Sequence, residues 1–194
     1  MRLTHTGEDG FILYVPTEYS LHVYDTLFDK GRNYGISNAG YFALRGLRIE
    51  KMFSFWGQDL DKRTTPFECG RDFRVKLDKD FIGKGALLQQ RDEKIRKRFV
   101  QFLIDDHDLY RDPWPWGGEP IYRNDKFCGY TTSTTYGYSL EKQVCLGFIH
   151  NFDEVTKEKK PVLFDYITKN ANYEIEIAGK RYKAKVNIFP PNLK

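Results

Sequence analysis

Residues 120–132 read PIYRNDKFCGYTT, in which two short runs of aromatic and β-type residues are divided by the turn residues Asn124 and Asp125. Runs of this length and composition, bounded by turn residues, are typical of β-strands. The same pattern recurs over residues 99–104, 145–150, 161–167, 173–177 and 181–188. Seven such runs without an intervening helix predict a small barrel or sandwich in the second half of the chain.

The first half alternates strand and helix patterns. Residues 11–15 form a short apolar run that predicts a strand, and apolar side chains at helical spacing predict a helix over about 17–31. A second helix is expected over about 37–51, with Tyr41, Leu44 and Leu47 on its buried side. Further along, a strand is expected at 73–77 and a third helix within 81–90.

The charged segment RDEKIRKR at 91–98 marks the change from one pattern to the other. Charged, polar segments of this kind are typical of domain boundaries. We therefore expect an α+β protein with one domain over residues 1–95 and a second over 96–194.

The composition excludes several classes of protein. The 194 residues are 40% hydrophobic and 30% charged, which is typical of a globular chain with a core. No apolar run approaches 18 residues, so no membrane span is expected. The net charge of +4 is small, and the basic groups alternate with acidic ones, which disfavours a nucleic-acid partner. The first ten residues carry no readable targeting signal.

The residues that most often carry chemistry do not form a convincing site. The three cysteines are far apart and contain no C-x-x-C pair, so neither a disulfide framework nor a zinc site is expected. The acidic cluster at 105–108 has no second ligand group at chelating spacing, and a solvated strand end is the preferred interpretation. GKG at 83–85 is too short for a phosphate-binding loop. WPW at 114–116 could stack on a ligand, although a packed turn closing the barrel is favoured.

Five motifs, read together, resemble one known family. They are TGEDG at 6–10, LRIEK at 47–51, WGQDL at 56–60, TPFE at 65–68 and DFIGK at 80–84. Their order and spacing are similar to the folate-binding half of the aminomethyltransferases, the glycine-cleavage T-proteins. Residues 98–190 resemble the C-terminal β-barrel of that family. The resemblance therefore implies a partial folate-binding α/β domain followed by a small antiparallel barrel.

The same module also forms the C-terminal part of the mitochondrial dimethylglycine and sarcosine dehydrogenases and of the regulatory subunits of pyruvate dehydrogenase phosphatase. The chain resembles the regulatory subunits most. The motifs that carry this likeness are AGY at 39–41 with ALR at 43–45, CGR at 69–71, WPW at 114–116, CLGF at 145–148 with HNF at 150–152, and YEI at 173–175 with AG at 178–179. By resemblance, the partner is the catalytic phosphatase subunit, whose magnesium response the regulatory subunits adjust. The compartment that the resemblance implies is the mitochondrial matrix.

Two family contacts to folate are lost in this chain. In T-proteins a glutamate after the T-G-E-x-G motif holds the pterin ring, and its position is occupied by Ile12 here. A second contact, from an arginine, falls on Leu44. Neither side chain can accept or donate a hydrogen bond, so the polar edge of a buried pterin would lose about 1–3 kcal/mol or more. Arg45 lies about 100° further around the helix and cannot simply substitute.

The resemblance places the family's catalytic aspartate upstream of Met1, so no catalytic residue is expected in the chain. No metal or cofactor is expected either, and tetrahydrofolate remains as the disfavoured alternative. A flavin domain, and with it FAD, would also lie upstream. The chain then resembles the C-terminal piece of a longer protein or a truncated gene product, whose first domain is an incomplete sheet with an exposed apolar edge.

Two functions follow from these expectations. The preferred one is a non-catalytic regulatory module that contacts the catalytic phosphatase. The alternative is the tetrahydrofolate-binding C-terminal part of a flavin-dependent dehydrogenase of the dimethylglycine or sarcosine type, or of an aminomethyltransferase.

Residues in or beside the family's pocket segments are the candidates for any surviving site: Tyr14, Arg45, Arg48, Trp56 and Tyr130. Each also has an ordinary structural interpretation. Tyr14 could belong to a strand core, Arg48 could pair with Glu50 or Glu68, and Trp56 could pack between the domains.

Overall fold

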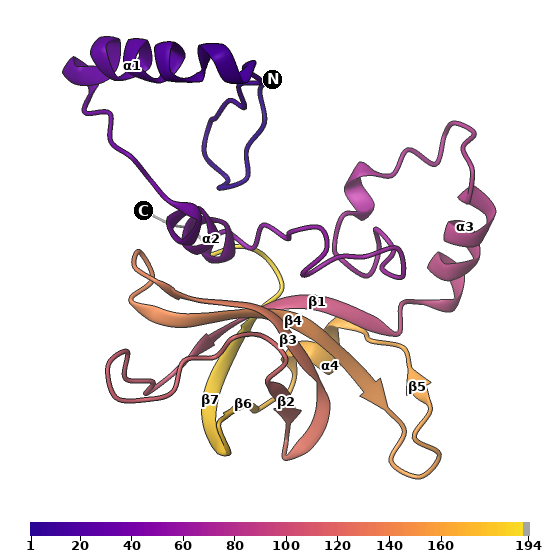
Figure 1. The fold of residues 1–194 in the computed structure, drawn as a ribbon. Helices are drawn as coiled ribbons and strands as arrows, with labels where there is room; N and C mark the ends of the chain where they lie inside the picture. Colours follow the sequence, from indigo (N-terminus) through magenta and orange to yellow (C-terminus); the bar gives the residue numbers. More distant parts are fainter. Residues whose placement is uncertain (192–194) are drawn as a thin grey trace.

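The C-terminal half of the protein is a closed barrel in a computed structural model that describes residues 1–191. Six antiparallel strands form a closed barrel through the pairing of β1 with β4 (Figure 1). The two-residue β5 pairs in antiparallel fashion with the end of β4. In spatial order the strands are β1 (Lys97–Ile104), β7 (Lys180–Asn187), β6 (Tyr173–Ile177), β2 (Pro120–Arg123), β3 (Lys126–Gly137), β4 (Lys142–Phe152) and β5 (Lys159–Lys160). The expected antiparallel barrel is confirmed.

Alternate residues of β4 serve two different cores, because successive side chains of a strand point to opposite faces. Cys145 and Ile149 belong to the cluster that fills the barrel, together with Phe102 of β1. Val144 and Leu146 belong to a second cluster that includes Ile49 of the N-terminal half. The outer face of the barrel therefore supplies the surface on which the N-terminal half packs.

Helices and loops make up the N-terminal half. Its elements are η1 (Thr17–Tyr19), α1 (Ser20–Gly31), η2 (Arg32–Tyr34), α2 (Tyr41–Glu50), η3 (Asp72–Arg74) and α3 (Lys84–Glu93). Figure 1 shows α2 lying over the barrel and α1 set apart from it. No residue of α1 is buried. The apolar side chains of α1 therefore contribute little to the core of the chain.

Several sequence expectations for this half are wrong. Within the described residues, no strand precedes Lys97, and the expected strand at 11–15 is a single bridge between Arg2 and Phe11. The expected strand at 73–77 is replaced by η3. The expected incomplete sheet is therefore absent from the described chain. What remains of the expected apolar edge is a set of exposed side chains in the N-terminal loop and on the helices.

A helix also interrupts the barrel strands, contrary to the expected uninterrupted series. A strand was expected at 161–167, but residues 164–167 belong to the helix α4 (Phe164–Thr168). Ile167 is buried, and its amide donates to the carbonyl of Leu163 four residues earlier, so the segment follows the helical period. The Tyr166 hydroxyl donates to the His150 carbonyl and ties the helix to β4.

His150 gives the fold a dependence on pH. Burial, with Lys159 nearby, lowers its pKa from 6.5 to about 4. Between pH 6.5 and about 4 the folded protein therefore binds fewer protons than the unfolded chain. The contribution of neutral His150 to the free energy of unfolding is present above pH 6.5 and is lost as the pH falls towards 4. We expect the urea midpoint to fall over this range, and less steeply in His150→Asn. His22→Asn on exposed α1 is the control, and an equal fall in both variants would contradict the assignment.

No helix within residues 1–191 has both the length and the apolar character needed to cross a lipid bilayer.

Candidate functional site at the junction of helix α2 and the barrel

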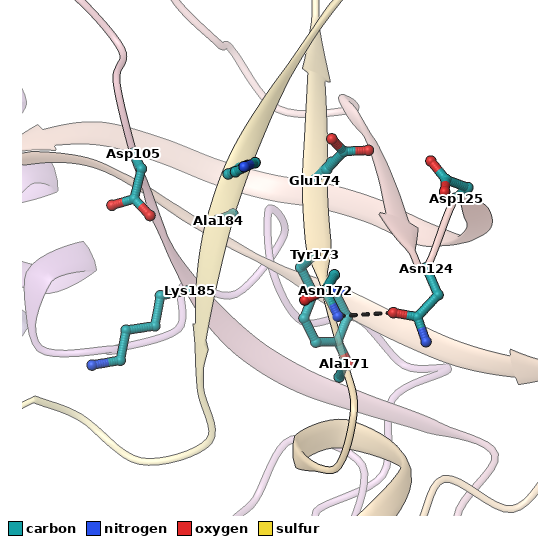
Figure 2. Close-up of a pocket in the computed structure, with 10 residues that line it drawn as sticks. Asp105, Asn124, Asp125, Ala171, Asn172, Tyr173, Glu174, Ala184 and Lys185 are labelled. Atoms are coloured by element: carbon teal, nitrogen blue, oxygen red, sulfur yellow. Dashed lines mark hydrogen bonds between the residues drawn. The ribbon is translucent and has the colours of Figure 1, made fainter.

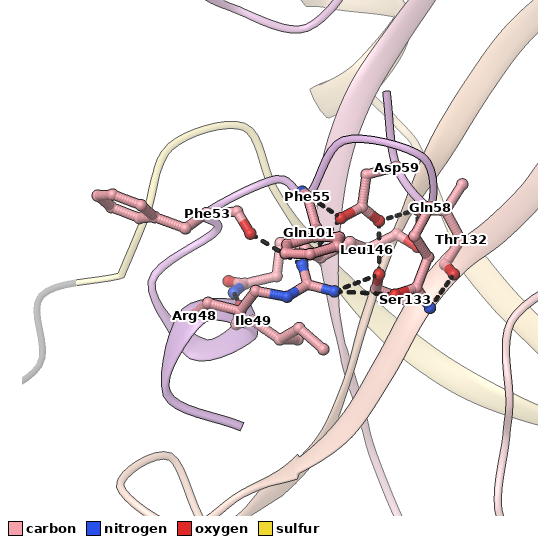
Figure 3. Close-up of polar contacts among 10 residues, drawn as sticks. All are labelled: Arg48, Ile49, Phe53, Phe55, Gln58, Asp59, Gln101, Thr132, Ser133 and Leu146. Carbon is pink, nitrogen blue, oxygen red and sulfur yellow. Dashed lines mark hydrogen bonds and ion pairs between the residues drawn. The ribbon is translucent and has the colours of Figure 1, made fainter. Parts of the chain in front are cut away.

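A buried ion pair joins the N-terminal half to the barrel. The Arg48 guanidinium, 2% exposed, donates to Asp59 Oδ2 at 2.8 Å and to Ser133 Oγ of β3 at 2.8 Å (Figure 3). It also donates to the Phe53 carbonyl at 2.9 Å and to Gln58 Oε1 at 3.2 Å. Four of the five N–H donors of Arg48 are used in this way, so little of the guanidinium is left for a ligand.

The Asp59 carboxylate is equally well satisfied. It accepts the Phe55 amide at 2.8 Å, the Ser133 hydroxyl at 2.6 Å and the Thr132 hydroxyl at 2.5 Å (Figure 3). Burial lowers the pKa of Arg48, and the negative charge of Asp59 opposes that shift, so the guanidinium stays charged. Arg48 therefore pairs with Asp59, and the expected pairing with Glu50 or Glu68 is wrong.

The end of α2 is fixed to the barrel by two further buried side chains. Gln101 of β1 donates to the carbonyls of Ile49 and Glu50 at 2.8 and 2.9 Å, which satisfies two acceptors that a helix end leaves free. The Glu50 carboxylate accepts the amides of Ser139 and Leu140 in the β3–β4 turn at 2.7 and 3.1 Å. These contacts explain why Arg48, Ile49 and Glu50 are the buried residues of α2, instead of the expected Tyr41, Leu44 and Leu47.

A cavity of about 410 Å³ opens beside this junction, between α2, the β3–β4 hairpin and the loop at 114–116. We name it the Arg45 pocket. Five of its ten lining residues are aromatic, and the ten are Phe42, Ala43, Arg45, Trp114, Pro115, Trp116, Thr134, Thr135, Tyr136 and Tyr138. Arg45 is the one charged side chain among these ten, and none of them carries a carboxylate.

Arg45 brings an unpaired positive charge to the pocket. Arg45 forms no ion pair within residues 1–191, and its Nε is buried without a hydrogen-bond partner. Phe42 and Ala43 belong to the first turn of α2, which carries no acidic residue and no side-chain cap. The free amides of a helix's first turn favour negative charge. The pocket therefore suits an anionic group next to an apolar one.

The structure separates the residues that the sequence proposed as pocket-lining. Arg45 lines the Arg45 pocket, while Arg48 lies in the buried ion pair. Tyr14 and Trp56 are 77% and 69% exposed, so neither the strand-core nor the domain-packing interpretation describes them. Tyr130 is exposed and packs edge-on against another aromatic ring of β3.

The two positions assigned to lost folate contacts do not meet in this pocket. Ile12 is half-buried in the N-terminal loop, where its amide donates to the Met1 carbonyl. Leu44 is half-buried on α2. Neither is among the residues that line the Arg45 pocket. Sequence reasoning missed Phe42, Tyr136 and Tyr138. The motif YGY at 136–138 was an available signal for the two tyrosines, and no comparable signal marks Phe42.

A second cavity, of about 540 Å³, lies along β6 and β7 (Figure 2). Acidic and basic side chains share its lining, among them Glu174, Lys183 and Lys185. Asp105 also lines it and pairs with Lys142 at 2.5 Å. Asn124 accepts the Asn172 amide at 2.9 Å and so holds one wall together (Figure 2). Mixed charges of this kind give no preference for one class of ligand.

The thiols that could act as nucleophiles are protonated, and the groups that could bind a metal ion are not clustered. Burial raises the pKa of the Cys128 thiol to about 12 and raises those of Cys69 and Cys145, so all three stay protonated at neutral pH. In the acidic cluster at 105–108, the Asp108 carboxylate accepts the amides of Tyr110 and Arg111. In the described part of the chain, no three His, Cys, Asp or Glu residues are placed to hold a metal ion.

Two family models match the chain. The model for the GCVT N-terminal domain matches residues 1–79, and the model for the glycine cleavage T-protein C-terminal barrel domain matches residues 97–193. A solved structure of the glycine cleavage system aminomethyltransferase T from Bartonella henselae superimposes with a TM-score of 0.76 at 22% identity. That match covers 97% of this chain and 48% of the other. It shows the fold.

Two curated relatives match nearly the whole chain. The mitochondrial pyruvate dehydrogenase phosphatase regulatory subunit of Mus musculus is 57% identical over 98% of this chain and 22% of its own length. The mitochondrial dimethylglycine dehydrogenase of Homo sapiens is 35% identical over 96% of this chain and 20% of its own length. The chain thus spans about a fifth of each of these relatives.

Proposed function

Because the chain belongs to the glycine-cleavage T-protein family, we propose that it is a non-catalytic regulatory module of that family. In this proposal it acts by protein–protein contact on the catalytic subunit of pyruvate dehydrogenase phosphatase. The observation that carries the proposal is its 57% identity to the mouse regulatory subunit, against 35% for the human dehydrogenase of the same family. Since both relatives are named as mitochondrial proteins, the mitochondrial matrix is the proposed compartment.

Loss of folate binding is the second part of the proposal. A pterin needs a hydrogen-bond acceptor for its ring N–H groups, which a carboxylate supplies. The family position for that group holds Ile12, and the Arg45 pocket has no carboxylate in its lining. Both observations support the proposal that tetrahydrofolate is not bound. FAD would require a domain outside residues 1–194.

One observation favours a second candidate, a tetrahydrofolate-binding C-terminal part of a flavin-dependent dehydrogenase. The human dimethylglycine dehydrogenase aligns with 96% of this chain, so the likeness to an enzyme extends over both domains. Arg45 also lines the Arg45 pocket, where a ligand carboxylate would find a positive charge.

Capture of the phosphatase tests the preferred function. The chain, immobilised on a biosensor, is exposed to the purified catalytic subunit of pyruvate dehydrogenase phosphatase. Saturable binding is expected, together with a shift in the magnesium concentration at which the phosphatase is half-active. If the subunit neither binds nor changes its magnesium response, the regulatory proposal is rejected.

Titration with tetrahydrofolate distinguishes the two candidates. No saturable change of tryptophan fluorescence is expected up to millimolar folate, because the polar edge of the pterin would be left unpaired at a cost of about 1–3 kcal/mol per group. Saturable micromolar binding would instead favour the dehydrogenase candidate.

The double variant Ile12→Glu with Leu44→Arg is expected to gain folate affinity of about tenfold or more, since each restored charge-assisted hydrogen bond contributes about 1.5–3 kcal/mol. Leu13→Glu with Leu47→Arg places the same charges on neighbouring exposed positions and is the control. If both double variants bind folate equally, or neither does, the assignment of Ile12 and Leu44 to the lost contacts is wrong.

A further inference from the structure

We propose that the Arg45 pocket is the surface that receives the partner protein, and that it takes a partner segment in which an aromatic or aliphatic side chain lies next to a carboxylate. This inference rests on the proposed regulatory function and names the place and chemistry of the contact. The Arg45 pocket was defined above by its ten lining residues on α2, on the β3–β4 hairpin and at 114–116.

The apolar part of the pocket is unusually exposed. Phe42, Trp116 and Tyr138 are 76%, 72% and 76% exposed. Each is a large side chain whose removal from water is favourable. They come from three separate segments of the chain and line one cavity. Exposed apolar patches of this kind mark interaction sites, and tryptophan, tyrosine and arginine are the residues that most often dominate binding at interfaces.

The polar part of the pocket selects the charge of the occupant. Arg45 is the one charged side chain among the pocket's lining residues, and it is without an ion pair in residues 1–191. Its guanidinium favours a carboxylate, and an ammonium or guanidinium group would be repelled. The occupant is therefore acidic as well as apolar.

The loop wall of the pocket is held in shape before any partner arrives. The Thr134 hydroxyl donates to the Pro115 carbonyl at 2.5 Å, and the Trp114 indole N–H donates to the Leu109 carbonyl at 3.0 Å. The Glu119 carboxylate accepts the Trp116 amide at 2.6 Å, which leaves this carboxylate engaged with backbone instead of with Arg45. A preorganised wall lowers the entropy cost of binding.

The first experiment measures how substitutions in the pocket change binding of the catalytic phosphatase subunit to the full chain. Phe42→Ala, Trp116→Ala and Arg45→Gln are each expected to weaken binding at least about tenfold, as interface anchors do. Tyr110→Ala, at a 92% exposed aromatic outside the pocket, and Lys62→Gln are the matched controls and are expected to bind as the unsubstituted chain does. Circular dichroism of all five variants checks that each is folded before binding is compared.

The second experiment uses two synthetic peptides of twelve residues that differ only in the residues flanking a central Phe, which are Asp in one and Lys in the other. The fluorescence of Trp114 and Trp116 reports binding. The Asp peptide is expected to bind saturably and at least about tenfold more tightly than the Lys peptide. Arg45→Gln is expected to remove most of that difference, whereas Lys62→Gln keeps it.

The outcomes separate this inference from the proposed function. If the phosphatase subunit binds the three pocket variants as well as the unsubstituted chain, the pocket proposal is overturned while the regulatory function stands. If the unsubstituted chain does not bind the phosphatase, the regulatory function fails, and equal or absent binding of the two peptides then overturns the pocket proposal as well. Concentration-dependent dimerisation that the pocket variants abolish would assign the surface to a second copy of the chain, against the proposal.

Discussion

Asp59→Ala is expected to lower the free energy of unfolding by about 3–5 kcal/mol, because removing one partner of a buried ion pair leaves an uncompensated charge in the interior. The charge left behind is Arg48, which is 2% exposed and has no other carboxylate in contact within residues 1–191. The Phe55 amide and the hydroxyls of Thr132 and Ser133 lose their acceptor as well. Urea denaturation followed by circular dichroism measures the effect.

Two further variants separate the buried charge from the loss of packing. The double variant Arg48→Met with Asp59→Leu removes both charges, and it is expected to be more stable than Asp59→Ala, since apolar replacement of a whole buried pair is often neutral. Asp9→Ala breaks the exposed pair with Arg2 and is expected to cost no more than about 1 kcal/mol. A double variant as unstable as Asp59→Ala would show that the hydrogen-bonded geometry, and not the unpaired charge, sets the loss.

Gly129→Ala is expected to lower the free energy of unfolding by about 3 kcal/mol or more, or to prevent folding. Gly129 lies in β3 between β2 and β4, beside the shift in register between β2 and β3. A Cβ atom at this position would lie 1.9 Å from the Phe148 carbonyl oxygen. Because that neighbour is backbone of the paired strand, relief requires the β3–β4 ladder to separate.

Gly85→Ala is the matched control, with the opposite expected sign. Gly85 lies in α3, and a Cβ there would have no heavy atom within 4 Å. Alanine is the better helix former, so a gain of about 0.5 kcal/mol is expected. Equal stability of the two glycine variants in thermal and urea unfolding would contradict the close approach of β3 and β4 at Gly129.

The barrel was predictable because its strands carry their own signal. Aromatic and β-branched runs divided by turn residues identified six of the seven proposed strands, and the barrel closes through the β1–β4 pairing. The seventh run, at 161–167, is rich in apolar residues that fit either period, and burial of Ile167 in a helix decided the outcome. Short apolar runs do not distinguish strand from helix by composition alone.

The N-terminal half was less predictable because its apolar residues are mostly exposed. Residues 11–15 have strand composition but no neighbouring strand in the described chain, and composition alone does not form a sheet. The buried face of α2 carries Arg48 and Glu50, which a hydrophobic pattern excludes from a core. Their partners, Ser133 and the Ser139 amide, lie 85 and 89 residues further along, so no local pattern could show them.

The Arg45 pocket was only partly foreseeable for the same reason. Arg45 was proposed from its place beside a family motif, and the tryptophans of the 114–116 loop were noticed as potential stacking groups. That Phe42, Trp116 and Tyr138 line one cavity depends on how α2 docks on β3, which is a tertiary fact. The assignment of Ile12 and Leu44 to lost folate contacts stays a prediction until the titration is done.

The bond between Arg48 and Ser133 also constrains the time order in which a growing chain reaches its final form. Ser133 is synthesised 85 residues after Arg48, which at 5–20 residues per second corresponds to about 4–17 seconds. During that interval the guanidinium and the Asp59 carboxylate have no barrel to cover them and remain hydrated. The hydrogen bond between Arg48 and Ser133 therefore forms only after β3 has left the ribosome, so the segment that carries Arg48 and Asp59 is expected to stay sensitive to protease in a nascent chain until then.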